Sequence, residues 1–95
     1  MKMVFEWDDE KAKLNIAKHH VSFDLAKRVW DDPLLFVGLD DVVNGEQRWR
    51  AIGIVGTLML MVVIHTYPDK HEEERVRIIS ARQATKHERK CYEQG

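Results

Sequence analysis

The residues best suited to acid–base chemistry lie in two consecutive apolar segments in the middle of the chain. Gly56-Thr57 separates these segments and predicts a two-residue hairpin turn, which places Arg48 opposite His65, with Glu46 on the same face. A guanidinium, an imidazole and a carboxylate at one end of a sheet could transfer protons to and from a phosphodiester. Spacing alone favours a simpler interpretation, in which Glu46 and Arg48 form an edge ion pair and His65 is a hydrogen-bonded boundary residue.

A second group of candidate residues is basic and follows these segments. In a predicted strand from Arg75 to Ser80, alternation places Arg75 and Arg77 on one face, and Arg82 lies just beyond the strand. Arginine can hold a phosphate with two donors at once, so these residues are candidates for phosphate binding. The alternative is a solvated strand face whose arginines pair with the acidic run Glu72–Glu74.

The C-terminal segment is predicted to form a helix that begins with the capping box Thr85-Lys86-His87-Glu88 and ends near Gln94. Its basic side chains share one side and would attract a polyanion, although such a face is most often simply solvated: they are Lys86, Arg89 and Lys90. His87 and Cys91 have helical i, i+4 spacing, but two ligands do not make a metal site. We therefore expect neither a metal ion nor a cofactor.

Two helices are predicted before the strands. The first begins at Asp8 or Asp9 and ends near Lys18, and the second begins after the N-cap Ser22 and ends at Asp31-Asp32-Pro33. His19 follows the first helix and is a second candidate for proton transfer. Histidines at such positions more often complement the helix dipole or pack at the edge of the core.

The remaining elements are strands, which indicates an α+β fold. We expect a single domain over residues 1–95 with two N-terminal helices, a four-stranded, mainly antiparallel sheet and a C-terminal helix. The expected strands are Leu34–Val37, Gln47–Val55, Leu58–Tyr67 and Arg75–Ser80.

Size and composition are consistent with this single domain. The chain has 95 residues, of which 44% are hydrophobic and 33% charged, so it is not typical of a disordered segment. Its single cysteine excludes an internal disulfide. The acidic start is unlike a signal peptide, and the longest apolar run, Leu58 to Ile64, is too short to span a bilayer. We expect a soluble, cytoplasmic protein with no membrane partner.

The formal net charge of −1 conceals a separation of charge along the chain. Residues 1–74 carry nine Lys and Arg against fourteen Asp and Glu, whereas residues 75–95 carry six against two. A near-neutral protein usually does not bind nucleic acid, but the basic C-terminal segment locates where a nucleic acid would bind.

Short motifs along almost the whole chain resemble the BrnT family of toxins. The N-terminal ones are Phe5-Glu6-Trp7-Asp8, Lys18-His19, Val21-Ser22-Phe23 and Asp31-Asp32-Pro33. The later ones are Glu46 to Arg48, Ile52-Gly53, Val63 to Thr66, Ile78-Ile79-Ser80-Ala81-Arg82, Ala84, Glu88-Arg89 and Tyr92. Three features depart from the family pattern: His20 stands where glycine is common, Trp30 replaces a frequent phenylalanine, and the acidic run Glu72–Glu74 is additional.

The resemblance implies the ribonuclease half of a bacterial type II toxin–antitoxin pair, with a fold related to RelE-type toxins. It implies RNA cleavage without a metal, in which the 2′-hydroxyl attacks the neighbouring phosphate, and consequent arrest of translation and growth. The implied partner is a BrnA-like antitoxin that binds operator DNA and neutralises the toxin in a hetero-oligomer, so that the toxin reaches DNA only through it.

The resemblance also favours functional roles for the candidate residues. Arg77 and Arg82 would stabilise charge on the phosphate, His65 or His19 would transfer protons, and Glu46 would orient the RNA or act as base. The residues expected to bind RNA are Arg48, Arg75, Lys86, Arg89 and Lys90. The competing interpretation is a non-enzymatic binding module or operon co-regulator that only partners the antitoxin.

Overall fold

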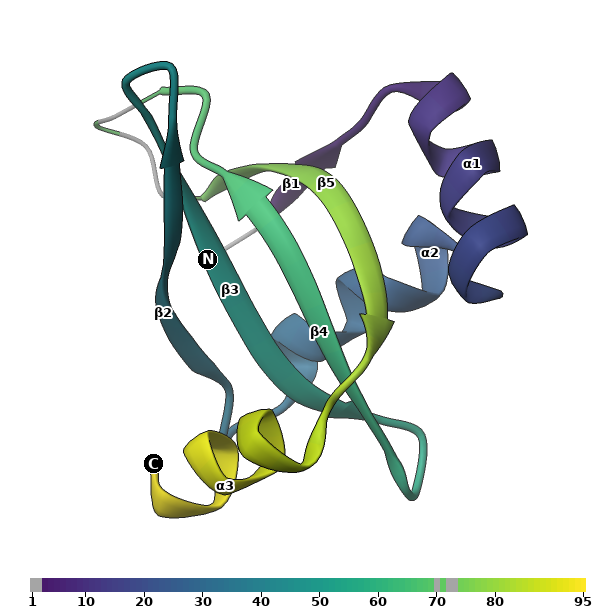
Figure 1. Ribbon diagram of the computed structural model, residues 1–95, viewed down its shortest axis with the longest axis vertical. Helices are drawn as coiled ribbons and strands as arrows, with labels where there is room; N and C mark the ends of the chain where they lie inside the picture. The colour runs from purple at the N-terminus through teal and green to yellow at the C-terminus, as the bar shows by residue number, and fades with distance from the viewer. Residues whose placement is uncertain (1–2, 70, 72–73) are drawn as a thin grey trace.

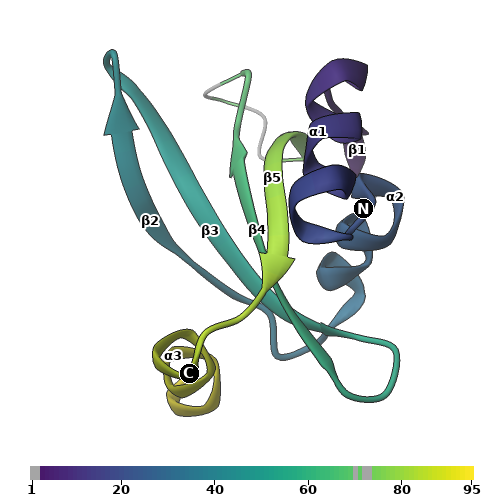
Figure 2. The same cartoon turned by 45° about the vertical axis from the view of Figure 1, so that its right-hand side comes forward.

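The computed structural model describes residues 3–69, 71 and 74–95, and it has an α+β fold with helices on both faces of one sheet (Figure 1). The strands are β1 (Val4–Glu6), β2 (Phe36–Val43), β3 (Glu46–Val55), β4 (Met59–Thr66) and β5 (Arg75–Gln83). The helices are α1 (Asp9–His19), α2 (Phe23–Ala26), the 3-10 helix η1 (Lys27–Asp31) and α3 (Lys86–Gln94). Figure 2 shows α1 and α2 on one face of the sheet and α3 on the other.

The sheet has five strands in the order β1-β5-β4-β3-β2, and it is mixed, not four-stranded and antiparallel as expected. The additional strand, β1, pairs in parallel with the first residues of β5. A strand of three residues shows no periodicity of its own in the sequence, so only its pairing with β5 reveals it. The acidic run expected next to Arg75 lies largely outside the described residues, because Glu72 and Glu73 are not among them.

The strand β2 extends six residues further along the chain than expected, through Asp40 and Asp41. Aspartate is uncommon in strands, but β2 is an edge strand with a bulge between Leu39 and Asp41, where carboxylates can reach outward. It is joined to β3 by Asn44-Gly45, and both residues have positive φ, as a tight hairpin turn of this kind requires.

The register of the β3–β4 hairpin differs by one residue from the prediction. Val55 pairs with Met59, so Leu58 belongs to the turn, and His65 lies opposite Trp49 instead of Arg48. A shift of one residue exchanges the two faces of a strand. Arg48 and His65 therefore point to opposite sides of the sheet.

The main core lies between the sheet and the N-terminal helices. It contains Phe23, Val29, Ala51, Val63 and further apolar residues of β5. A smaller cluster, formed by Ile52, Leu60 and Val62, lies beneath α3 on the other face. Burial on both faces of β3 and β4 explains why these strands are the most apolar segments of the sequence.

The predicted helix caps are confirmed. The Asp8 carboxylate accepts the backbone N–H of Glu10 at 2.8 Å, and the Ser22 hydroxyl accepts that of Leu25 at 3.1 Å. The capping box of α3 is complete, because Thr85 and Glu88 each bond the other's backbone N–H. Among the described residues, no helix is long and apolar enough to cross a membrane.

Candidate functional site

A row of arginines occupies the sheet face on which α3 lies. In β3, Arg48 and Arg50 alternate with the core residue Ala51, and in β5, Arg75 and Arg77 alternate with the core residue Val76. In Figure 1, α3 covers only one end of this face. We call the remaining part, with Glu46, Arg48, Arg50, Thr66, Arg75 and Arg77, the arginine face.

Two buried polar atoms on the arginine face have no hydrogen-bond partner among the described residues. They are Nε of Arg48 and the hydroxyl oxygen of Thr66. The register places these residues opposite each other on β3 and β4, one position beyond the pair Trp49 and His65. Buried polar groups in proteins are nearly always paired, so these two atoms can take their partner from a ligand.

The arginines nearest to β1 are paired with an acid that the sequence did not indicate. Arg77 donates from Nε and from one terminal nitrogen to the Glu6 carboxylate, at 3.1 and 2.9 Å, and Arg75 lies 3.9 Å from it. Both arginine side chains are about half exposed. The strand face is therefore ion-paired through Glu6 of β1, whereas the expected partners Glu72 and Glu73 lie outside the described residues.

Arg82 is part of a network that fixes α3 to the sheet. Its two terminal nitrogens donate to the two oxygens of Glu88, at 2.6 and 2.7 Å. Arg50 lies 3.7 Å from Glu88 and donates to Asp40 at 2.8 Å. The hydrogen bonds between these two side chains lower the pKa of Glu88 to about 2 and raise the pKa of Arg82. Glu88 is therefore an anion that holds Arg82 in place.

A cavity of about 460 Å³ lies at the C-terminal end of α1, and we call it the α1 cavity. Lys18, His19 and His20 line it from the helix, and Arg82 lines it from β5. Val21, Leu25, Met59 and Gln83 complete its wall. The cavity thus brings together two of the residues expected to be catalytic, His19 and Arg82, which are 63 positions apart in the sequence.

The position of α1 beside this cavity is fixed by Asn15. Its amide donates to the carbonyls of Val21 and Ala81, both at 2.9 Å, and its oxygen accepts the N–H of Ala81 at 3.1 Å. The amide of Asn15 therefore substitutes for a neighbouring strand on the open edge of β5. His20 then ends α1 in the left-handed conformation, with φ of 60°, which glycine adopts more easily than any other residue.

His65 lies away from these residues, in the main core. It is fully buried, its ring is 4.9 Å from that of Trp30, and Nδ1 and Nε2 lie 3.2 and 3.3 Å from the Val63 carbonyl and the Tyr67 hydroxyl. Because a carbonyl only accepts, Nδ1 carries the proton and Nε2 accepts from Tyr67. Burial lowers the pKa of His65 to about 4. The predicted pairing of Arg48 with His65 is therefore wrong, and His65 matches the simpler interpretation of a hydrogen-bonded histidine.

The other predicted residues fall into two groups. Glu46 is exposed at the start of β3, two residues before Arg48 and on the same face. Lys86, Arg89 and Lys90 are exposed on α3, whereas Glu88 of the same helix is buried against the sheet. Tyr92 donates to Asp32 at 2.6 Å, which raises the pKa of Tyr92 to about 12, so it attaches α3 to the segment between η1 and β2 and does not titrate near neutral pH.

Sequence reasoning missed Arg50, Asp40 and Thr66 as parts of this site. The alternation of β3 already placed Arg50 on the same face as Arg48, and this was the one available signal.

The part of the chain that the structure describes contains no cluster of three or more metal-ligating side chains. His87 and Cys91 lie 4.0 Å apart on α3.

Comparisons with known proteins identify a protein family and a similar solved structure. The family model of the ribonuclease toxin BrnT of type II toxin–antitoxin systems matches residues 7–88. The crystal structure of the Brucella abortus ribonuclease toxin BrnT is 30% identical, and the alignment covers 90% of this chain and 99% of that one, with a TM-score of 0.66. A comparison with curated proteins finds no match.

Proposed function

This chain belongs to the BrnT family of ribonuclease toxins of type II toxin–antitoxin systems, and from this premise we propose that it cleaves RNA at the α1 cavity without a metal ion. The observation that carries the proposal is the meeting of His19 and Lys18 with Arg82 across that cavity. An imidazole beside two cations provides both proton transfer and stabilisation of negative charge.

The reaction is an attack of the RNA 2′-oxygen on the adjacent phosphorus. His19 takes the proton from the 2′-hydroxyl as the new P–O bond forms. Lys18 stabilises the negative charge that develops on the phosphorane, and Arg82 does so once the phosphate replaces Glu88 as the partner of its guanidinium. As the bond from phosphorus to the 5′-oxygen breaks, the imidazolium of His19 gives its proton to that oxygen, which leaves a 2′,3′-cyclic phosphate and a 5′-hydroxyl.

The other titratable groups near the site are poorly suited to this proton transfer. Glu88 has its pKa lowered to about 2 and is occupied by Arg82, and Tyr92 has its pKa raised to about 12. His65 is buried in the main core and has its pKa lowered to about 4. These observations support His19 as the group that transfers protons.

The arginine face binds a further stretch of the RNA strand, on the face of the sheet opposite α1 (Figure 2). Arg75 and Arg77 supply half-exposed guanidinium groups, and Arg48 lies on the same face of the sheet. Such groups bind phosphates of any sequence. Arg82 connects the arginine face with the cavity, because it follows Arg77 along β5 and lines the cavity wall.

In the cell, this activity would arrest translation and growth in the cytoplasm. A BrnA-like, DNA-binding antitoxin would neutralise it in a hetero-oligomer and connect it to operator DNA. Type II membership supports the existence of an antitoxin. The relation of the fold to RelE-type toxins remains a prediction from the resemblance.

The central test is RNA cleavage by the purified toxin in excess EDTA. We expect cleavage to persist, with a 2′,3′-cyclic phosphate on the upstream product. His19→Gln should lower the cleavage rate about 100-fold or more, the usual contribution of a positioned acid–base group. His87→Gln is the matched control, because His87 is an exposed histidine on α3 outside the cavity.

Three results would contradict the proposal. Loss of cleavage on chelation would contradict the metal-independent mechanism. Full activity of His19→Gln, with loss in His20→Gln instead, would move the proton transfer to the neighbouring histidine. A folded toxin that cleaves no RNA but binds its antitoxin would support the non-enzymatic alternative.

A further inference from the structure

The tip of the β3–β4 hairpin exposes large apolar side chains. Leu58, in the turn, is 86% exposed, and Met59 and Ile54 next to it are 38% and 37% exposed. A turn of this kind needs no leucine for folding, since polar residues and glycine form turns at lower cost. An exposed apolar tip is instead typical of a surface that binds another protein.

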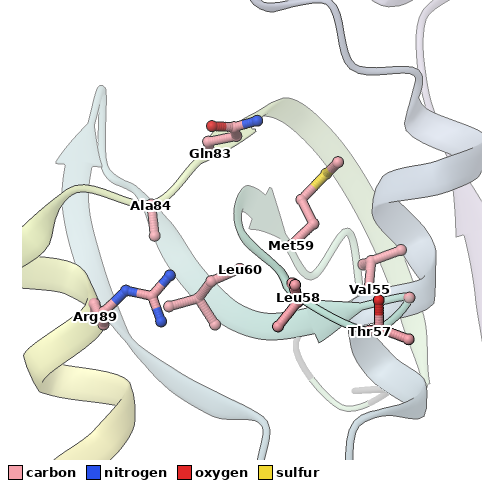
Figure 3. Close-up of a pocket in the computed structure, with 9 residues that line it drawn as sticks. Val55, Thr57, Leu58, Met59, Leu60, Gln83, Ala84 and Arg89 are labelled. Atoms are coloured by element: carbon pink, nitrogen blue, oxygen red, sulfur yellow. The ribbon is translucent and has the colours of Figure 1, made fainter.

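A groove of about 520 Å³ runs between this tip and α3 (Figure 3), and we call it the hairpin groove. Val55, Leu58 and Leu60 line it from the hairpin, and Ala84 and Arg89 line it from the opposite side. Figure 3 shows the Arg89 side chain extending from α3 toward Leu60. The groove therefore presents apolar side chains from the hairpin, the polar side chains of Thr57 and Gln83, and one guanidinium.

The charge around the groove selects for an acidic ligand. Arg89 makes no ion pair with any residue that the structure describes, and Lys86 and Lys90 are exposed on the same helix. A ligand that fills the groove must offer apolar side chains to Leu58 and Leu60 and a carboxylate to Arg89. A protein segment with both properties fits these demands better than RNA, whose phosphates gain nothing from an exposed leucine.

The hairpin groove also adjoins the α1 cavity. Met59 and Gln83 line both of them, so the two share a wall. A segment that binds in the groove and continues past Met59 reaches the cavity lined by Lys18 and His19.

We propose that the hairpin groove is the docking site for an acidic, apolar segment of the antitoxin, which from there covers the α1 cavity and excludes RNA. The presence of an antitoxin follows from family membership, and only the inhibitory effect rests on the proposed place of catalysis. Binding and cleavage can therefore be measured separately.

The test uses Leu58→Asp, which changes an exposed turn residue and leaves the core intact. Its matched control is Leu34→Asp, because Leu34 is 70% exposed and precedes β2, outside the groove. Binding is measured by calorimetry with the purified antitoxin encoded beside the toxin gene. Leu58→Asp should weaken binding about tenfold or more, as loss of a buried apolar contact at an interface does, and Leu34→Asp should not.

Arg89→Glu tests the charged part of the groove. It should weaken antitoxin binding and make the remaining affinity less sensitive to salt, because the guanidinium–carboxylate attraction is lost. In parallel, Leu58→Asp should cleave RNA at the wild-type rate but should escape inhibition by an equimolar amount of antitoxin.

Three results would overturn the inference. The first is unchanged antitoxin affinity in both Leu58→Asp and Arg89→Glu. The second is equal weakening by Leu34→Asp, which would show that any exposed apolar residue matters. The third is loss of RNA cleavage in Leu58→Asp with antitoxin affinity retained, which would assign the groove to RNA. A toxin that shows no cleavage still allows the affinity measurement, so failure of the proposed function is distinguished from failure of this docking site.

Discussion

At the scale of single residues, burial decides what the histidines can do. His19 lines a cavity beside Arg82, whereas His65 is enclosed by Trp30, Tyr67 and the main core. The two side chains have identical chemistry, but desolvation keeps His65 neutral well below the pH at which a free histidine becomes charged. Residue type alone therefore identified both as candidates, and only their surroundings separate them.

The buried state of His65 predicts a pH dependence of stability. Its pKa is about 4 in the folded protein and 6.5 in the unfolded chain, so the unfolded state binds the proton first. The free energy of unfolding should be at its full value above pH 6.5 and should fall by about 3 kcal/mol as the pH drops to 4. Urea denaturation across this range measures the effect.

Two variants identify the source of this pH dependence. His65→Phe removes the titrating group from the core and should abolish most of the decrease between pH 6.5 and 4.5, above the range in which Glu88 titrates. His19→Gln should retain it. An unchanged decrease in His65→Phe would show that another group is responsible.

At the scale of elements, the open edge of β5 determines where the α1 cavity forms. The strand β1 covers only the first residues of this edge, and Asn15 of α1 satisfies Ala81 further along it. On the other side of the core, a Cβ on Gly53 would lie 2.9 Å from the Val29 carbonyl oxygen, so η1 packs against β3 only because glycine is there. Individual side chains thus set how closely helices approach the sheet.

Asn15 gives a direct test of this arrangement. Asn15→Ala should lower the free energy of unfolding by about 2–4 kcal/mol, because it leaves the buried N–H and C=O of Ala81 and the carbonyl of Val21 without these partners. Lys13→Ala, on the exposed side of the same helix, should change it by less than about 0.5 kcal/mol. Equal stability of the two variants in thermal or urea denaturation would exclude an anchoring role for Asn15.

At the scale of the whole molecule, charge is distributed by face as well as along the chain. The basic C-terminal segment contributes Arg75, Arg77 and Arg82, but Arg48 and Arg50 come from the half of the sequence with an acidic excess. The sheet collects all of them on the side of α3. A formal net charge of −1 therefore coexists with one face rich in arginine.

This distribution predicts how RNA binding responds to salt. Each phosphate contact with a single strand contributes about −0.7 to the slope of log affinity against log salt concentration. The double variant Arg75→Gln, Arg77→Gln should therefore flatten the slope by about 1.4. Lys11→Gln, Lys13→Gln on α1 is the matched control, and fluorescence anisotropy with a labelled RNA gives both slopes. An equal slope in the arginine variant and the wild type would contradict RNA binding at this face.

The sequence by itself determined the local elements, since caps and periodicity depend on neighbouring residues. The N-caps Asp8 and Ser22, the capping box of α3 and the apolar central strands were all predicted, as was the family. The motifs that carry the family resemblance are also local, because each is a short run of adjacent residues.

Only the tertiary structure decided the pairing of distant segments. The strand β1 exists through its contact with β5, and one extra turn residue, Leu58, shifted the β3–β4 register and separated Arg48 from His65. The meeting of His19 with Arg82 likewise depends on the bonds of Asn15 to Ala81, 66 positions along the chain. Such contacts leave no local pattern in the sequence, because their free energy arises only when the sheet edge and the helix are both formed.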